Sequence, residues 1–173
     1  MLLRAAGGIL VITATSAGGI LAAERIRNQY EQLKYLQKLI CLLRSEILYA
    51  RSYLGEAFGR IGSKARSPYR EWMSELCSRM EERTGTAFSG IWENSTGKCL
   101  KDAGLPGNEL ARLADLGNQL GIADADMQVK LLDLYLDELS KSMDELREGM
   151  KMKIRLCRCL GVMSGIFVMI LLY

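Results

Sequence analysis

Hydrophobic positions divide the chain into an apolar run at each end and a charge-rich middle segment. No charged residue occurs from Ala5 to Ala23, or from Cys159 to Tyr173. As a helix, the first run would span roughly 28 Å, close to the thickness of a bilayer core. We therefore predict a transmembrane helix in residues 1–23, a helical domain in 24–158 and a second transmembrane helix in 159–173.

Both terminal runs allow another interpretation. The residues "LAA" before Glu24 resemble a small-residue cleavage site, so the first run could be a signal peptide that is removed. Arg25 and Arg27 argue against this, because positive charge directly after the run opposes export. The second run is short for a span unless it extends back to Leu156, and it could instead be a helix buried in the domain core.

Between the runs, apolar residues recur at the spacing of three and four that amphipathic helices require. The first predicted helix continues from the first run and carries Leu33, Leu36, Ile40, Leu43, Ile47, Ala50, Leu54 and Ala57, with Leu39, Leu42 and Leu48 widening the stripe. Shorter helices are predicted from Pro68 to about Arg83, around Phe88–Trp92 and across Leu110–Leu120. A last helix carries Gln128, Leu132, Tyr135, Leu139, Met143 and Leu146 and continues into the second run. No strand pattern competes, so the fold class is all-α: an antiparallel helical bundle flanked by two transmembrane helices.

Capping residues mark the expected helix ends. Ser67 is the expected N-cap of the second helix, with Pro68 at its first helical position. The stretch "LGIAD" breaks the chain later on, where Gly121 is expected in a left-handed conformation that ends one helix. Asp124 is then the expected N-cap of the last helix.

Glycine pairs at both ends of the first run predict a helix-packing surface. Residues eleven apart nearly eclipse each other on a helix, so the small side chains align in one stripe that lets another helix approach closely. The stripe consists of Gly7, Gly8, Ala14, Thr15, Gly18 and Gly19. Its partner is either the second run, which carries Gly161 and Gly165, or another protein. The plain alternative is that glycine is common in membrane helices.

Basic residues are concentrated on the domain side of both runs. They are Arg25 and Arg27 after the first run, and Lys151, Lys153, Arg155 and Arg158 before or at the start of the second. Cytoplasmic flanks of membrane helices are enriched in Lys and Arg, so we predict a cytoplasmic domain with both chain ends outside. The net charge of +3 is too small to indicate nucleic-acid binding.

Residues that carry chemistry are sparse. The chain has no histidine, which removes the commonest general base and metal ligand. Its cysteines form no C-x-x-C pair, and we expect them to be small buried hydrophobic residues. They are Cys41, Cys77, Cys99, Cys157 and Cys159. Asp124 and Asp126 are explained by the start of a helix. No nucleotide-binding or nucleophile motif occurs, so we expect no enzyme activity, no metal site and no cofactor.

Three stretches are similar to one known family. They are "LRSEILYARSYLGEA" with Glu46 and Tyr49, "WENS" beginning at Trp92, and "GNQLGIADADMQ". The last fits the pattern G-x-x-L-G-x-x-D-x-x-x-Q through Gly117, Leu120, Gly121, Asp124 and Gln128. With the terminal apolar runs also in place, the chain resembles the stage III sporulation protein AB family of endospore-forming bacteria over nearly its whole length.

The resemblance implies a function that the residues alone do not. The family's soluble domain is similar to the helical F domain of type II secretion and type IV pilus platform proteins, which carry two such domains and typically three membrane spans. It implies a platform in the mother-cell membrane, within a channel complex between mother cell and forespore. The implied partners are a companion secretion-type ATPase, other sporulation channel membrane proteins and the lipid bilayer. A membrane-anchored helical adaptor or signalling scaffold unrelated to secretion is the alternative, and homo-oligomer formation stays open.

Overall fold

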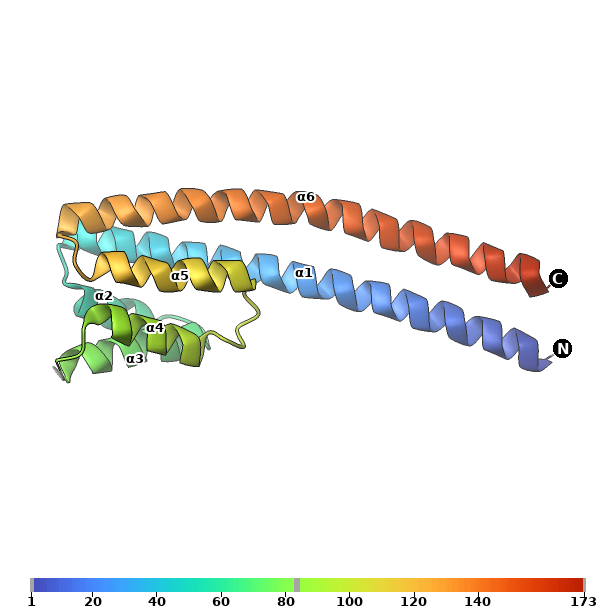
Figure 1. Cartoon of the computed structure of the whole chain (residues 1–173), viewed down its shortest axis with the longest axis horizontal. Coiled ribbons are helices and arrows are strands. Elements are labelled where there is room, and N and C mark those ends of the chain that lie inside the picture. Colours follow the sequence, from blue (N-terminus) through green and yellow to red (C-terminus); the bar gives the residue numbers. More distant parts are fainter. Residues whose placement is uncertain (1, 83–84, 173) are drawn as a thin grey trace. The chain divides into compact units, whose positions relative to one another are not determined.

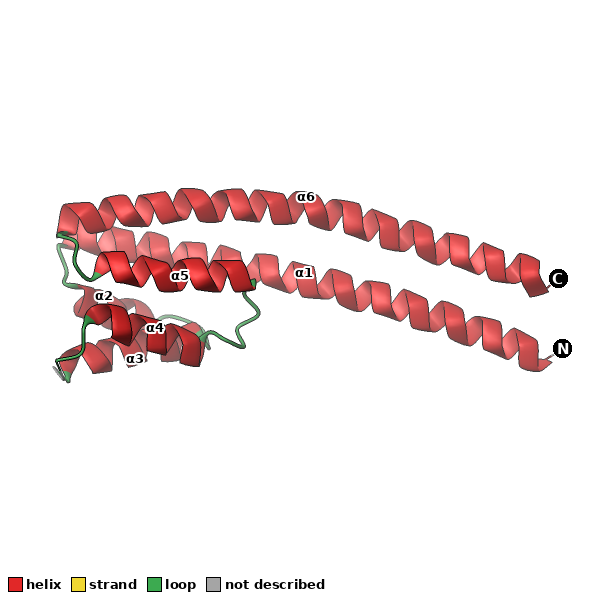
Figure 2. Ribbon diagram, viewed as in Figure 1, coloured by secondary structure: helices red, strands yellow, loops and turns green. Residues whose placement is uncertain are grey.

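The computed structural model shows a chain built from helices (Figure 1). It describes residues 2–82 and 85–172, and the side chains of residues 24–82, 85–150, 152 and 163. Within these residues the helices are α1 (Leu2–Ala50), α2 (Leu54–Gly62), α3 (Tyr69–Glu81), α4 (Phe88–Cys99), α5 (Gly107–Leu120) and α6 (Ala125–Leu172). Figure 2 shows helices and connecting loops throughout the described part. The all-α class predicted from the sequence is confirmed.

Two compact units make up the chain. One is a helical bundle of Glu31–Met143, and the other combines Met1–Tyr30 with Asp144–Tyr173. The second unit contains both predicted membrane segments. The side chains of those segments, including the glycine stripe and the second-run glycines, lie outside the described residues. Over the part of the chain that is described, no helix combines the length with the apolar character that crossing a membrane requires.

Within the bundle, α1 buries most of the apolar stripe that its periodicity predicts; Ala50, at the end of the helix, is exposed instead. The stripe residues Leu33, Leu36, Ile40, Leu43 and Ile47 are all between 0% and 3% exposed. Spacing of three and four residues places these side chains on one face of the helix, where each loses contact with water.

The prediction that Leu39, Leu42 and Leu48 widen this stripe is only partly right. Leu39 is buried as expected, whereas Leu42 and Leu48 are 43% and 36% exposed. Beside the buried face, the guanidinium of Arg44 binds both carboxylate oxygens of Asp133 in α6. This pair connects the first and last helices within the bundle.

The end of α1 corrects the sequence prediction. We expected one helix through Ala57, but α1 ends at Ala50 and α2 begins at Leu54. Between them Arg51 adopts a φ of 49°, a left-handed conformation that a right-handed helix cannot contain. The buried face of α2 is formed by Leu54, Ala57, Phe58 and Ile61. The apolar positions of α2 continue the three- and four-residue spacing of α1. No glycine or proline marks the break between the two helices, so the spacing alone does not reveal it.

The start of α3 also differs from the prediction. Pro68 occupies the N-cap position without any side-chain capping bond, and Ser67 is exposed. Backbone carbonyls accept the hydrogen bonds instead: the Arg70 N–H donates to Arg66 at 3.0 Å, and the Trp72 N–H donates to Pro68 at 3.1 Å. The first turn is therefore satisfied without a hydroxyl cap.

An aromatic cluster forms the core of the bundle around Trp92 of α4. Its ring centroid lies 5.1 Å from that of Trp72 in α3 and 5.7 Å from that of Phe88. Both indole N–H groups are paired: Trp72 Nε1 donates to Thr96 Oγ1 at 3.1 Å, and Trp92 Nε1 donates to the Leu113 carbonyl at 2.6 Å. Buried indoles need such partners, so these bonds fix the orientation of both rings.

Candidate functional site

The motif of Gly117, Leu120, Gly121, Asp124 and Gln128 forms the corner between α5 and α6. As predicted, Asp124 caps α6, because its Oδ1 accepts a hydrogen bond from the Met127 N–H at 2.8 Å. Gln128 Nε2 donates to the Leu120 carbonyl at 3.0 Å. That carbonyl is one of the acceptors that the end of α5 leaves without a helical partner. The two side chains thus join the end of one helix to the start of the next.

The motif glycines are required by close packing rather than by backbone conformation. We expected Gly121 to be left-handed, but its φ is −70°. A Cβ at Gly121 would lie 2.9 Å from Phe88 Cδ1, and a Cβ at Gly117 would lie 2.1 Å from Trp92 Cδ1. Real side chains do not tolerate such distances, so the bare α5 backbone is what lets the aromatic rings of α4 approach.

The other family residues separate into structural and exposed ones. Trp92 is fully buried in the aromatic cluster. Glu46 of α1 accepts a hydrogen bond from Arg60 Nη1 of α2 at 3.0 Å, which links the two helices. Tyr49, in contrast, is 79% exposed. A large side chain so exposed adds little to the stability of the bundle, so Tyr49 is a candidate for contact with another molecule.

Exposed apolar side chains gather where α1 turns into α2 and α5 turns into α6. We define the apical patch as Leu48, Tyr49, Tyr53 and Ile122. Tyr53 and Ile122 are 83% and 90% exposed. A groove of about 480 Å³ is lined by Leu48, Tyr53 and residues of both turns, with Arg51, Asp124 and Asp126 as its charged members. Tyr49 and Ile122 are sequence neighbours of lining residues. An apolar surface with a polar rim is typical of protein interfaces.

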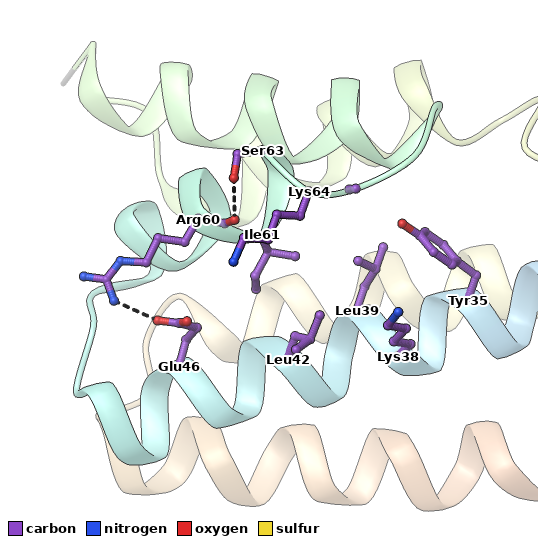
Figure 3. Close-up of a pocket in the computed structure, with 10 residues that line it drawn as sticks. Tyr35, Lys38, Leu39, Leu42, Glu46, Arg60, Ile61, Ser63 and Lys64 are labelled. Carbon is purple, nitrogen blue, oxygen red and sulfur yellow. Dashed lines mark hydrogen bonds and ion pairs between the residues drawn. The ribbon is translucent and has the colours of Figure 1, made fainter.

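A second groove, of about 350 Å³, lies between α1 and α2. In Figure 3, Leu39 and Leu42 of α1 point toward Ile61 of α2 across this groove. We call it the lysine groove and define it by Lys38, Leu39, Leu42, Arg60, Ile61 and Lys64. This groove could not be predicted from the sequence, because its residues come from α1, α2 and the turn after α2, and the apolar spacing does not reveal the break between the two helices.

The described cysteines are not the buried residues that we expected. Cys41 is exposed, while Cys77 and Cys99 are half-buried; the side chains of Cys157 and Cys159 lie outside the described residues. Desolvation raises the pKa of all three described thiols. They are therefore protonated at neutral pH rather than activated as nucleophiles. In the described part of the chain, no cluster of His, Cys, Asp or Glu could hold a metal ion.

One buried charge was not expected from the sequence. Glu109 in the first turn of α5 is 1% exposed, although acidic residues there normally face water. Its Oε1 accepts hydrogen bonds from Arg112 Nη1 at 2.8 Å and from Asn108 Nδ2 at 3.2 Å. Its Oε2 and the hydroxyl of Tyr135 are buried without a hydrogen-bond partner among the described residues. Burial raises the pKa of Tyr135, and the nearby Glu109 charge raises it further, so the phenol stays neutral.

The predicted basic flanks are only partly within the described side chains. Arg25 and Arg27 are exposed. The side chains of Lys151, Lys153, Arg155 and Arg158 lie outside the described residues, as do those of the predicted membrane helix-packing set. Both sets stay predictions.

Comparison with known proteins identifies the family. The family model described as stage III sporulation protein AB matches residues 4–173. The chain is similar to stage III sporulation protein AB of Bacillus subtilis (strain 168), with 24% identity over 171 residues that cover 99% of each chain. A solved structure of the same name has a TM-score of 0.64 and 24% identity, and the match covers 72% of this chain and 97% of that one. The resemblance inferred from the sequence motifs is thus confirmed, and the chain belongs to the stage III sporulation protein AB family.

Proposed function

We propose that the chain is a non-catalytic component of a sporulation complex and that the apical patch is its contact with a cytoplasmic partner. The observation that carries the proposal is the exposure of Tyr49, Tyr53 and Ile122 beside a groove of about 480 Å³. Interface hot spots are enriched in large aromatic side chains that lose their water on binding. Family membership supports the setting, which is sporulation.

The partner that we propose is a companion ATPase resembling secretion ATPases. The family resemblance implies such a partner, and this chain carries no nucleotide-binding motif of its own. In this scheme the chain is a platform that links the ATPase to other membrane proteins of a channel between mother cell and forespore. A membrane-anchored adaptor or signalling scaffold unrelated to secretion is the alternative.

Paired substitutions test the apical contact. Replacing Tyr53 and Ile122 with serine in the full chain should weaken co-purification with the ATPase by about tenfold or more, because the hot-spot contacts are lost. Leu134→Ser is the matched control, since Leu134 is 58% exposed on α6 outside the patch. Equal capture of the ATPase by both variants would show that the patch is not the contact. Capture of signalling proteins without the ATPase from sporulating cells would favour the alternative.

The membrane anchor is the second part of the proposal. The two uncharged terminal runs support spans at residues 1–23 and 159–173, and the basic flanks support a cytoplasmic position of the bundle. The family resemblance implies that the membrane is the mother-cell membrane that faces the forespore. A reporter that is active only in the cytoplasm should give signal when it is inserted after Gly85, which is exposed in the loop between α3 and α4. An enzyme that is active only outside should work after Tyr173. Activity of the exterior enzyme at the Gly85 site would reverse this topology.

We also propose that the glycine stripe passes movement of the bundle to a neighbouring membrane helix. A bulky side chain at Gly18 would block close approach of that helix. Gly18→Leu should therefore preserve binding of the ATPase but reduce spore yield, and a flexible Gly-Ser insertion after Ala23 should do the same. Normal spore yield with both changes would show that the terminal segments serve only as anchors.

A further inference from the structure

We propose that the lysine groove binds an acidic amphipathic helix of a partner protein. This contact goes beyond the proposed function, because the groove shares no lining residue with the groove beside the apical patch. Three properties of the groove carry the inference: its apolar floor, its unpaired cations and its length.

The floor of the groove is apolar and partly open to water. Leu42 is 43% exposed, whereas Leu39 and Ile61, which line the same groove, are 2% and 5% exposed. Leu42 therefore offers an apolar contact that the bundle does not use, and its lining neighbours are buried in the bundle. An apolar groove between two helices is a common binding surface for the apolar face of a partner helix.

The cations around this floor differ in whether they are already paired. Arg60 is held by Glu46 at 3.0 Å and lies 3.9 Å from Glu56. Arg66, beside the groove, has its guanidinium carbon 4.0 Å from the centroid of the Tyr35 ring. Both arginines already have partners within the bundle. They therefore stabilise its fold and are not free to bind a ligand.

The other two cations that line the groove are Lys38 and Lys64. Both are exposed, one on α1 and one just after α2, and within the described residues neither ammonium group has a hydrogen-bond or ion-pair partner. Glu46, the acidic residue of the lining, is neutralised by Arg60. A ligand in this groove therefore meets apolar side chains along the middle and unpaired positive charge on both walls.

The length of the groove sets the size of the ligand. Its α1 wall runs from Tyr35 to Glu46, which corresponds to about 16 Å or three helical turns. A helix with leucine-like residues on one face and Asp or Glu on both flanks matches this arrangement in shape and in charge. A phosphate-rich polymer such as RNA would use the lysines but would leave the apolar floor without a partner.

The test uses isothermal titration calorimetry on the full chain in a non-ionic detergent. The probe is a synthetic helical peptide of about 18 residues, with leucines on one face and glutamates on both flanks; about three of its five turns cover the groove, and the remaining turns keep the short peptide helical. We expect saturable binding that weakens about tenfold or more in the Lys38→Glu, Lys64→Glu variant. The matched control is Lys101→Glu, Lys130→Glu, which makes the same change of charge at exposed lysines outside the groove and should leave affinity within about twofold.

A charge-swapped peptide makes the test specific. The same peptide with lysine in place of glutamate should bind the Lys38→Glu, Lys64→Glu variant better than the unchanged protein. Leu42→Ala should weaken binding of the acidic peptide, but the protein should still prefer the peptide with acidic flanks over the one with basic flanks. Similar losses in the groove variant and in the control, or stronger binding of a short RNA than of the peptide, would overturn the proposal. The Tyr53→Ser, Ile122→Ser variant should bind the peptide normally, so failure of the apical contact and failure of this one can be told apart.

Discussion

Gly117 of α5 leaves the space that the indole of Trp92 occupies. A Cβ there would come within 2.1 Å of Trp92 Cδ1, and the indole cannot withdraw without losing its hydrogen bond to the Leu113 carbonyl. At the scale of single residues, the position of one of the two largest core side chains therefore depends on the absence of a Cβ on the neighbouring helix.

This contact predicts opposite effects for two glycine-to-alanine changes. Gly117→Ala should destabilise the protein by about 3 kcal/mol, because it overpacks a dense core. Gly97→Ala, in the interior of α4, should stabilise it by roughly 0.5–1 kcal/mol, because nothing lies within 4 Å of the new Cβ and alanine favours the helix. Thermal unfolding of both variants is the measurement. A Gly117→Ala variant as stable as Gly97→Ala would show that the indole has room to move.

Arg51 carries a second residue-scale prediction. Its φ of 49° is a conformation that glycine adopts without a steric penalty. Arg51→Gly should therefore stabilise the protein by roughly 0.5–1 kcal/mol. Arg51→Ala removes the same side chain but keeps the Cβ, so it should give no such gain in chemical denaturation. Equal stability of the two variants would show that the turn relaxes without strain.

At the scale of elements, the junction of α5 and α6 depends on a hydrogen bond rather than on a charge. Asp124→Asn should change the free energy of unfolding by less than about 0.5 kcal/mol, because asparagine caps as well as aspartate. Asp124→Ala should cost about 1 kcal/mol, because the Met127 N–H loses its acceptor. A folded Asp124→Asn variant that no longer binds the ATPase would show instead that the carboxylate is functional.

The buried face of α1 carries the next prediction. Truncating Ile40 or Ile47 to alanine should cost about 2–5 kcal/mol, because each would leave a cavity in a closely packed core. Lys38→Ala, on the exposed side, should cost less than about 0.5 kcal/mol. The reverse order in thermal melts would mean that α1 presents another face to the core.

Most of the helices could be predicted from the sequence, because burial of one face imposes a period that apolar residues reveal. The break after Ala50 could not, since the apolar positions of α2 keep the spacing of α1. The role of Gly121 could not either, because the sequence signal for a left-handed glycine is the same as that for a glycine packed against a ring such as Phe88. Asp124 was predictable because an N-cap depends on local contacts, its own side chain and the N–H three residues on. The same reasoning failed at Ser67, where Pro68 takes the N-cap position.

At the scale of the whole molecule, the bundle is a unit with its own core. We predict that a fragment of residues 31–143 folds alone, because this unit contains the aromatic cluster and the Arg44–Asp133 pair. Circular dichroism should show a helical protein with a single cooperative unfolding transition. A fragment that is helical but melts gradually and binds hydrophobic dyes would show that the bundle needs the remaining parts of α1 and α6.

The grooves could not be predicted from the sequence, unlike the bundle that carries them. Lys38 and Lys64 lie on different elements, and their shared surroundings depend on how α2 folds back on α1. Tyr53 and Ala123 are about seventy positions apart in the chain and line one groove only because two turns meet. Interaction surfaces of this kind have no local spacing, so a three-dimensional structure is needed to find them.

The pairing of Trp72 and Trp92 gives the protein a built-in optical reporter. These are the chain's two tryptophans, and both are fully buried with centroids 5.1 Å apart in the bundle core. Tryptophan emission of the whole chain therefore originates in the bundle alone and should shift to longer wavelength when water reaches the indoles. Unfolding of the bundle can thus be followed in detergent or in a membrane without a label, while the terminal segments stay optically silent at the excitation wavelength of tryptophan.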